Sequence, residues 1–173
     1  IANGAECEPY ITCDDQLMRT HAPEIVTGLK IMLSLFPKAQ GVILIEDNKP
    51  EAIAAMKEAA AKETNIRIQI APKKYPQGGE KSVIKVVAGR DTKMSQLPAD
   101  AGCIVDNVGT IYAIYEAVCC STPLIHRIVT VTGPAVKAPG NFIVRAGTSC
   151  AELLQAAAKE LSADYMPKRN GSV

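Results

Sequence analysis

The sequence predicts an α/β fold with a mostly parallel sheet and flanking helices, followed by a small β-rich module. Three observations support this prediction. Strand-like apolar runs alternate with helix-like segments over residues 23–122, a rhythm typical of parallel sheets, whose strands need helical crossovers. One run, GVILIED at 41–47, is continuously apolar, as in a strand buried on both faces. Near Pro123 the pattern changes to two successive alternating segments, which favours a second module.

The first elements follow from the spacing of apolar residues. Residues 23–36 place apolar side chains at helical intervals between two prolines, which predicts an amphipathic helix. The strand at 41–47 follows. The Ala-rich segment 49–63 consists of strong helix formers, and residues 65–72 alternate apolar and polar side chains. Helix, strand, helix and strand are therefore expected in this order.

The later elements continue the pattern and then change it. We expect a short helix after the glycines of YPQGGEKS, a strand in GCIVDN and a helix in VGTIYAIYEAVC. PLIHRIVTVTG and NFIVRAGT both alternate, and the segment from residue 149 is helical, with Ser149 placed as its N-cap. We therefore divide the chain into an α/β domain at 1–122 and a small module at 123–173.

Composition excludes several classes of protein. The chain has 173 residues, 47% apolar content, 21% charged content and a net charge of +1, as in globular proteins with a real core. This balance gives no electrostatic footprint for nucleic acid. No apolar run reaches the roughly 18 residues of a membrane span, and no signal peptide is present, which favours a cytoplasmic protein. The start at Ile1 suggests a fragment of a longer polypeptide.

The cysteines do not form a metal-binding pattern. No pair has the C-x-x-C spacing of zinc or iron–sulfur sites, so we expect no metal centre within this chain. The six positions are Cys7, Cys13, Cys103, Cys119, Cys120 and Cys150.

The first candidate site lies in NGAECEPYITCDD, where Glu6 and Glu8 are two residues apart. In a strand, both carboxylates would project from one face. At the carboxyl end of a parallel strand they would lie where such sheets bind ligands. The alternative is a solvated strand end, with Asp14 and Asp15 capping the next helix.

Two further segments have ligand-binding character. The paired glycines of YPQGGEKS, at 75–82, would let the backbone approach a ligand at a helix N-terminus. The spacing is not that of a P-loop, which disfavours a nucleotide triphosphatase, and an ordinary loop is the alternative. Asp106 and Asn107 end a predicted strand, where Asn107 can cap the next helix or bind a ligand. His21 and His126 are interpreted as structural.

Together these segments resemble a known family. NGAECEPYITCDDQLM, EDNKPEAI, KYPQGGEKSVI and NVGTIYAIYEAV are similar to the central part of the C component of the Rnf-type electron transport complex, the bacterial ion-translocating ferredoxin:NAD oxidoreductase. The resemblance runs through nearly the whole chain. That family is in turn similar to the flavoprotein subunit of respiratory NADH dehydrogenase. It implies a complex I flavoprotein-like fold with a β-grasp second module of the soluble-ligand-binding type.

The resemblance also implies a set of site residues. One stretch would line the flavin and nicotinamide, a Gly-Glu turn would lie over the flavin ring, and a third stretch would lie near the FMN phosphate. The matching positions are Asn3, Glu6, Glu8, Gly79, Glu80, Asn107 and Thr110.

Three positions depart from the respiratory pattern. Ala5 replaces an aspartate, Lys81 replaces a second glutamate and Asp106 replaces an asparagine. The first two weaken the expected nucleotide contacts, and the third adds an acid near the implied phosphate.

The implied cofactors are FMN and NAD(H), with two 4Fe-4S clusters bound outside this chain. The Gly-rich FMN loop would precede Ile1, and the cluster cysteines would follow the C-terminus. The implied partners are the other components of the Rnf complex and, indirectly, ferredoxin. The implied location is the cytoplasmic face of the bacterial inner membrane, without a membrane span of its own.

We therefore expect part of an NAD-linked flavin and iron–sulfur oxidoreductase subunit, inactive as an isolated fragment. Two alternatives remain open. One is a cobalamin-reductase subunit of the same architecture, and the other is a non-catalytic docking module in which the flavin site has decayed.

Overall fold

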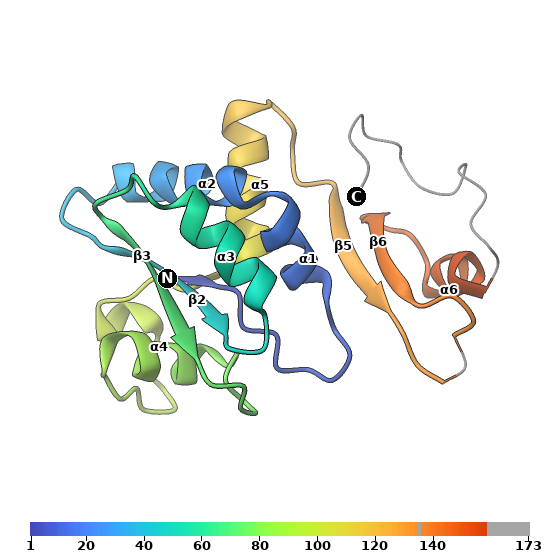
Figure 1. The fold of residues 1–173 in the computed structure, drawn as a ribbon, viewed down its shortest axis with the longest axis horizontal. Helices are drawn as coiled ribbons and strands as arrows, with labels where there is room; N and C mark the ends of the chain where they lie inside the picture. The colour runs from blue at the N-terminus through green and yellow to red at the C-terminus, as the bar shows by residue number, and fades with distance from the viewer. Residues whose placement is uncertain (135, 159–173) are drawn as a thin grey trace.

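The main sheet of the computed structural model, which describes residues 1–134 and 136–158, contains four parallel strands (Figure 1). Their order is β3-β2-β1-β4, and Ala2 of β1 lies between Ile43 of β2 and Asp106 of β4. This confirms the predicted mostly parallel sheet. The bounds are β1 Ala2–Asn3, β2 Gly41–Glu46, β3 Ile66–Ala71 and β4 Asp106–Asn107.

Helices cover both faces of this sheet. The first two, together with α3 and α5, pack on one face around Ile43 and Ile45, whereas α4 packs on the other face around Leu44 (Figure 1). The alternation follows from the strand's period of two, and every residue of β2 is buried, as predicted. The bounds are α1 Cys13–Thr20, α2 Ala22–Ser34, α3 Pro50–Ala59, α4 Glu80–Ala88 and α5 Val108–Cys119, with a 3-10 turn at Pro98–Ala101.

A close helix contact joins α2 to α5 at Gly28. A Cβ atom on Gly28 would lie 2.2 Å from the backbone oxygen of Ile111. Only glycine leaves room for the two backbones to approach this closely. This contact fixes α5, whose N-terminus borders the candidate site described below.

The second sheet is an antiparallel pair, β5 His126–Val131 and β6 Gly140–Arg145. It is followed by α6, Cys150–Ala158. The predicted pair of strands and the helix after them are confirmed. Ser149 caps this helix as expected: its hydroxyl accepts from the Glu152 N–H at 3.2 Å, and its own N–H donates to the Glu152 carboxylate at 2.8 Å. Residues 159–173 of the predicted module lie outside the described residues.

The second sheet lies beside α1 (Figure 1). Polar contacts join them. The Asn141 amide of β6 donates to the Gln16 side chain at 2.6 Å, and the Thr12 N–H donates to the Thr130 hydroxyl of β5 at 3.2 Å. The position of the second sheet therefore depends on the N-terminal turn of α1.

Two strand expectations need correction. The first strand ends at Asn3, because the Asn3 side chain accepts from the Ala5 N–H at 3.1 Å and turns the chain out of the sheet. The strand predicted in GCIVDN contains only its last two residues, since the Cys103 N–H instead donates to Pro98 in the preceding turn. The sequence pattern did not predict the bounds of α1.

Within the described ranges, no helix combines the length and the apolar character that crossing a membrane requires.

Candidate functional site

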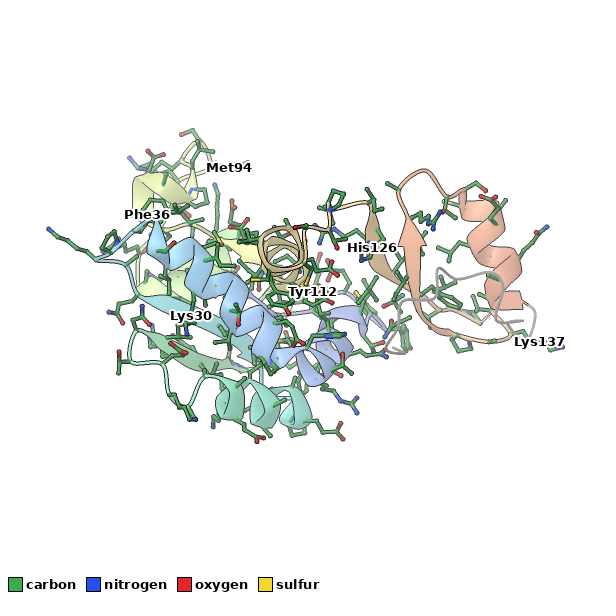
Figure 2. The ribbon with its side chains drawn as sticks, turned by 90° about the horizontal axis from the view of Figure 1, so that it is seen from above. Lys30, Phe36, Met94, Tyr112, His126 and Lys137 are labelled. Carbon is green, nitrogen blue, oxygen red and sulfur yellow. The ribbon has the colours of Figure 1, made fainter. Side chains whose placement is uncertain are left out.

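A cavity of about 510 Å³ opens beyond the carboxyl ends of β1 and β4 and reaches β5. Cavities of this size are typical of small-molecule sites. Both sheets contribute to its walls, and Tyr112 and His126, labelled in Figure 2, come from α5 and β5. Its polar lining includes Asn3, Glu6, Glu8, Asp14, Asn107 and Arg127.

Asn3 connects the end of β1 to the loop before α4. Its amide nitrogen donates to the Gly78 carbonyl at 3.0 Å. A Cβ atom on Gly78 would lie 2.6 Å from the Ala5 carbonyl oxygen, so the glycine allows this loop to lie directly against the chain that leaves β1. The first glycine of the predicted loop therefore borders the cavity.

Glu6 is the anchor of α1. Its side chain is 2% exposed, and its carboxylate accepts from the Asp14 and Asp15 N–H groups at 2.7 and 3.1 Å. The Lys49 ammonium lies 3.1 Å from the same carboxylate. The residue before the helix, Thr12, makes no side-chain cap. Glu6 takes that role from outside the helix, complementing its N-terminal dipole.

The expected strand pair of Glu6 and Glu8 is therefore wrong, because both residues follow the end of β1. Glu6 is buried and bonded to the helix, whereas Glu8 is exposed. Both still border the cavity. The alternative, in which Asp14 and Asp15 cap the helix, is also wrong, since their own N–H groups are the ones that Glu6 caps.

Asp14 is an acid of the cavity whose pKa is raised. Burial raises its pKa to about 6, and the nearby Glu6 carboxylate adds to the rise. A hydrogen bond from the Asn107 amide, at 2.6 Å, and the charge of Arg127 oppose it. A carboxyl group with this pKa exchanges its proton near neutral pH. The sequence offered only the acidic pair after a strand as a signal for it.

Asn107 caps α5 as one of the two sequence interpretations predicts. Its side-chain oxygen accepts from the Gly109 N–H at 2.7 Å, while its amide nitrogen donates to Asp14. The capping role thus holds the side chain at the edge of the cavity, where it also borders any ligand.

No motif in the sequence points to Arg127. It projects from β5 into the cavity lining and donates to the Thr110 hydroxyl at 3.0 Å. Its guanidinium lies 3.3 Å from where a Cβ atom on Gly109 would be, so it faces the first turn of α5. A single basic residue in an alternating strand does not form a recognisable motif. Its place at the cavity becomes visible only once the second sheet is positioned.

The remaining predicted residues lie beside the cavity lining. Gly79 is the N-cap of α4, and Glu80 is exposed at the first position of that helix. Thr110 accepts the bond from Arg127. The structure thus brings Asn3, Glu6, Glu8 and Asn107 together around one cavity, whose lining does not include Gly79, Glu80 or Thr110.

The two histidines, interpreted as structural from the sequence, both line the cavity and contact neighbouring side chains. His126 Nε2 lies 3.4 Å from a Glu116 carboxylate oxygen, and the His21 ring centre lies 4.9 Å from that of Tyr112.

Glu6, Cys13 and Asp14 place potential metal ligands within 4.8 Å of one another. Both Glu6 oxygens already accept hydrogen bonds, and burial raises the pKa of the Cys13 thiol, which disfavours the thiolate. We assign no metal to this group.

Glu46 gives a pH-dependent prediction. It ends β2 wholly buried, near the backbone N–H of Lys74 and the charged side chains of Lys49 and Lys73. Burial raises its pKa above the ordinary value of 4.5, and the nearby Lys49 offsets only part of the rise. The folded state therefore binds this proton more tightly than the unfolded state. Its stabilising contribution is present at low pH and is lost as the pH rises through the folded-state pKa.

We expect Glu46→Gln to raise the free energy of unfolding by about 1–3 kcal/mol at about pH 8, because it removes a buried charge whose desolvation the nearby lysines offset only in part. The difference in unfolding free energy between the two proteins should vanish near pH 4.5, the ordinary pKa of a glutamate side chain. Urea unfolding across this pH range measures it. Glu58→Gln, at an exposed position of α3, is the control. Equal pH profiles for Glu46→Gln and the unmodified chain would contradict the assignment.

Known proteins are similar to this chain in sequence. Residues 1–116 match the model of a family described as the Nuo51 FMN-binding domain. The C component of the ion-translocating oxidoreductase complex from Yersinia pestis bv. Antiqua is 46% identical over 157 residues, which are 91% of this chain and 25% of that protein. The Erwinia tasmaniensis protein of the same name is 43% identical over 171 residues, 99% of this chain and 21% of its own length. The chain thus spans a quarter or less of these relatives.

Solved structures support the fold. The chain is similar to NAD+-reducing NiFe hydrogenase in the H2-reduced state, with a TM-score of 0.72, 17% identity, and coverage of 88% of this chain and 32% of that chain. The air-oxidized state gives a TM-score of 0.67. The resemblance to the C component of the Rnf-type complex found in the sequence is confirmed by the named relatives, and the match over residues 1–116 shows that the chain belongs to the family of Nuo51 FMN-binding domains.

Proposed function

We propose that this chain is the flavin- and dinucleotide-binding part of an NADH:ferredoxin-type oxidoreductase subunit in a membrane-bound, ion-translocating complex. The observation that carries the proposal is the cavity at the carboxyl edge of the parallel sheet, within a chain of the FMN-binding family. Ligands of open α/β sheets bind at this edge. The names of the relatives support electron transfer within a multisubunit complex.

The residues of the cavity fit FMN. The volume of about 510 Å³ is that of a small-molecule site. Gly78 keeps the loop close to the cavity, and Arg127 places a positive charge at the N-terminus of α5, where an anionic phosphate is favoured. This cation opposes the charge of Asp14, while Glu6 is paired with Lys49. We propose Asn3, Gly79, Glu80, Asn107 and Thr110 as further flavin contacts.

When bound, FMN would supply hydride exchange with nicotinamide and single-electron transfer to iron–sulfur clusters. The residues of the chain would position the flavin and the dinucleotide and polarise their reacting groups. Glu8, exposed at the cavity rim, would accept hydrogen bonds from the dinucleotide, while Glu6 holds α1 in place and presents its charge to the same cavity. Asp14, with a pKa of about 6, can hold or release a proton beside it.

The wider setting is part of the proposal. The two 4Fe-4S clusters would be bound outside this chain, and the partners would be the other components of the Rnf complex and, indirectly, ferredoxin. The whole protein would lie on the cytoplasmic face of the membrane. We divide this chain into a flavin domain at 1–122 and a β-grasp module at 123–173, and we expect the isolated chain to be inactive.

FMN titration tests the proposal. We expect the full-length protein to bind FMN, and Arg127→Ala to weaken this binding about tenfold or more, because a charge-assisted hydrogen bond contributes about 1.5–3 kcal/mol. Quenching of flavin fluorescence measures the affinity. Arg145→Ala, at the end of β6, removes a similar charge outside the cavity lining and should have no effect. Equal losses in both variants, or no saturable binding, would reject this site.

One observation favours a docking module as the second candidate. Leu124 and Ile125, just before β5, are 51% and 53% exposed. A full-length protein that purifies without flavin but binds another component of the complex through these residues would favour this candidate.

A further inference from the structure

A second cavity, of about 360 Å³, lies on α4 and is bounded by the loops on either side of that helix. Its lining is distinct from that of the candidate flavin site. The two cavities lie near each other along the loop before α4, since Gly78 lines the first and Gln77 the second. The polar lining of the second comprises Lys74, Gln77, Lys81, Ser82, Lys85 and Thr92, with Asp91 as its acid.

The charge of this second cavity is positive. Three lysines face one carboxylate, and that carboxylate, of Asp91, is 2.6 Å from the Lys85 ammonium. The Lys81 ammonium donates to the Lys93 carbonyl at 2.6 Å, which leaves its charge uncompensated. Within residues 1–134 and 136–158, the ammonium of Lys74 has no acidic partner. The cavity is therefore electrostatically suited to an anion.

Two buried donors in the same cavity lack an acceptor. Gln77 is 5% exposed, and its amide nitrogen has no hydrogen-bond partner in the described part of the chain. The hydroxyl oxygen of Thr92 is also buried and also has no hydrogen-bond partner among the described residues. Unsatisfied buried polar groups are rare and costly, and they call for a partner. The Gln77 amide nitrogen can only donate, so its missing partner is an acceptor, and the Thr92 hydroxyl can donate to the same acceptor.

The start of α4 adds to this arrangement. Its N-cap is Gly79, which has no side chain to cap the first turn, and Lys81 and Ser82 of that turn line the cavity. The free N–H groups of a helix N-terminus attract anions. Glu80 lies in the same turn but is not part of the lining.

We propose that this cavity binds a phosphate-class oxyanion, with Gln77 as its buried donor and Lys74 and Lys81 as its cations. A tetrahedral phosphate accepts hydrogen bonds on several sides and can satisfy an amide, a hydroxyl and an ammonium together. The ligand is either free phosphate or the phosphate group of a nucleotide. The inference does not depend on flavin binding at the first cavity.

Calorimetric titration of the full-length protein with inorganic phosphate, at constant ionic strength, tests the proposal. We expect saturable binding with a Kd of about 1 mM or tighter. Gln77→Glu keeps the side-chain shape but replaces the donor with a like charge, and it should weaken binding at least about tenfold. Lys74→Ala should weaken binding in the same direction. Lys57→Ala, at an exposed position of α3, is the matched control and should have no effect.

Arg127→Ala separates this site from the first one. Loss of phosphate binding in that variant, with Gln77→Glu unaffected, would overturn the proposal and assign the anion to the first cavity. Absence of saturable binding would also overturn it. Titration with AMP identifies the source of the phosphate group. If AMP binds more tightly than phosphate, and Gln77→Glu weakens its binding, the ligand is a nucleotide. If AMP binds more weakly than phosphate, the ligand is free phosphate.

Discussion

Replacing Glu6 by alanine is expected to lower the free energy of unfolding by about 3–5 kcal/mol, the cost typical of breaking a buried charge pair. The variant leaves Lys49, whose side chain is 12% exposed, without its carboxylate partner. It also leaves the Asp14 and Asp15 N–H groups without an acceptor at the start of α1. Because β5 contacts α1, loss of this cap should also loosen the second sheet.

Urea unfolding followed by circular dichroism measures the effect. Glu8→Ala is the matched control, because this nearby carboxylate is exposed, and its free energy of unfolding should change by no more than about 0.5 kcal/mol. Similar losses in both variants would mean that the bonds of Glu6 to α1 do not carry the stability assigned to them.

Replacing Gly28 by valine should cost about 3 kcal/mol or more of stability, at the upper end of overpacking effects. Even the first added carbon would lie 2.2 Å from the Ile111 carbonyl oxygen, and this atom is backbone, so only a shift of α2 against α5 relieves the clash. The shift would move the N-terminus of α5, which holds Asn107 at the cavity.

Thermal unfolding and FMN affinity together check this second expectation, since both should fall. Ser34→Ala, at the exposed end of the same helix, should leave both nearly unchanged. A valine variant with unchanged melting temperature would contradict the close backbone contact.

The parts of the fold that the sequence predicted are those encoded by local periodicity. The continuous apolar run of β2 and the capping box of Ser149 each depend on residues a few positions apart. Glu6 was misinterpreted because its partners lie eight and nine residues away, on a helix that the local pattern did not define. A cap supplied from outside a helix has no fixed spacing.

The same reasoning explains the candidate site. Asn107 was predicted because an asparagine between a strand and a helix is a local signal. The place of Arg127 beside α5 arises from the approach of the second sheet, and the raised pKa of Asp14 arises from its burial. No spacing in the chain records either effect. Gly28 likewise gave no signal, since its role depends on a helix distant in the sequence, α5.

The bonds from Asn141 and Thr130 to the start of α1 have a thermodynamic consequence. They hold the second sheet against α1, and the cavity takes walls from both sides of that junction. A ligand in the cavity would contact both sides of this junction, so its binding and the docking of the second sheet would strengthen each other by the same free energy. Asn141 lies outside the lining of the cavity, yet its bonds to α1 would then affect ligand affinity through the position of the second sheet.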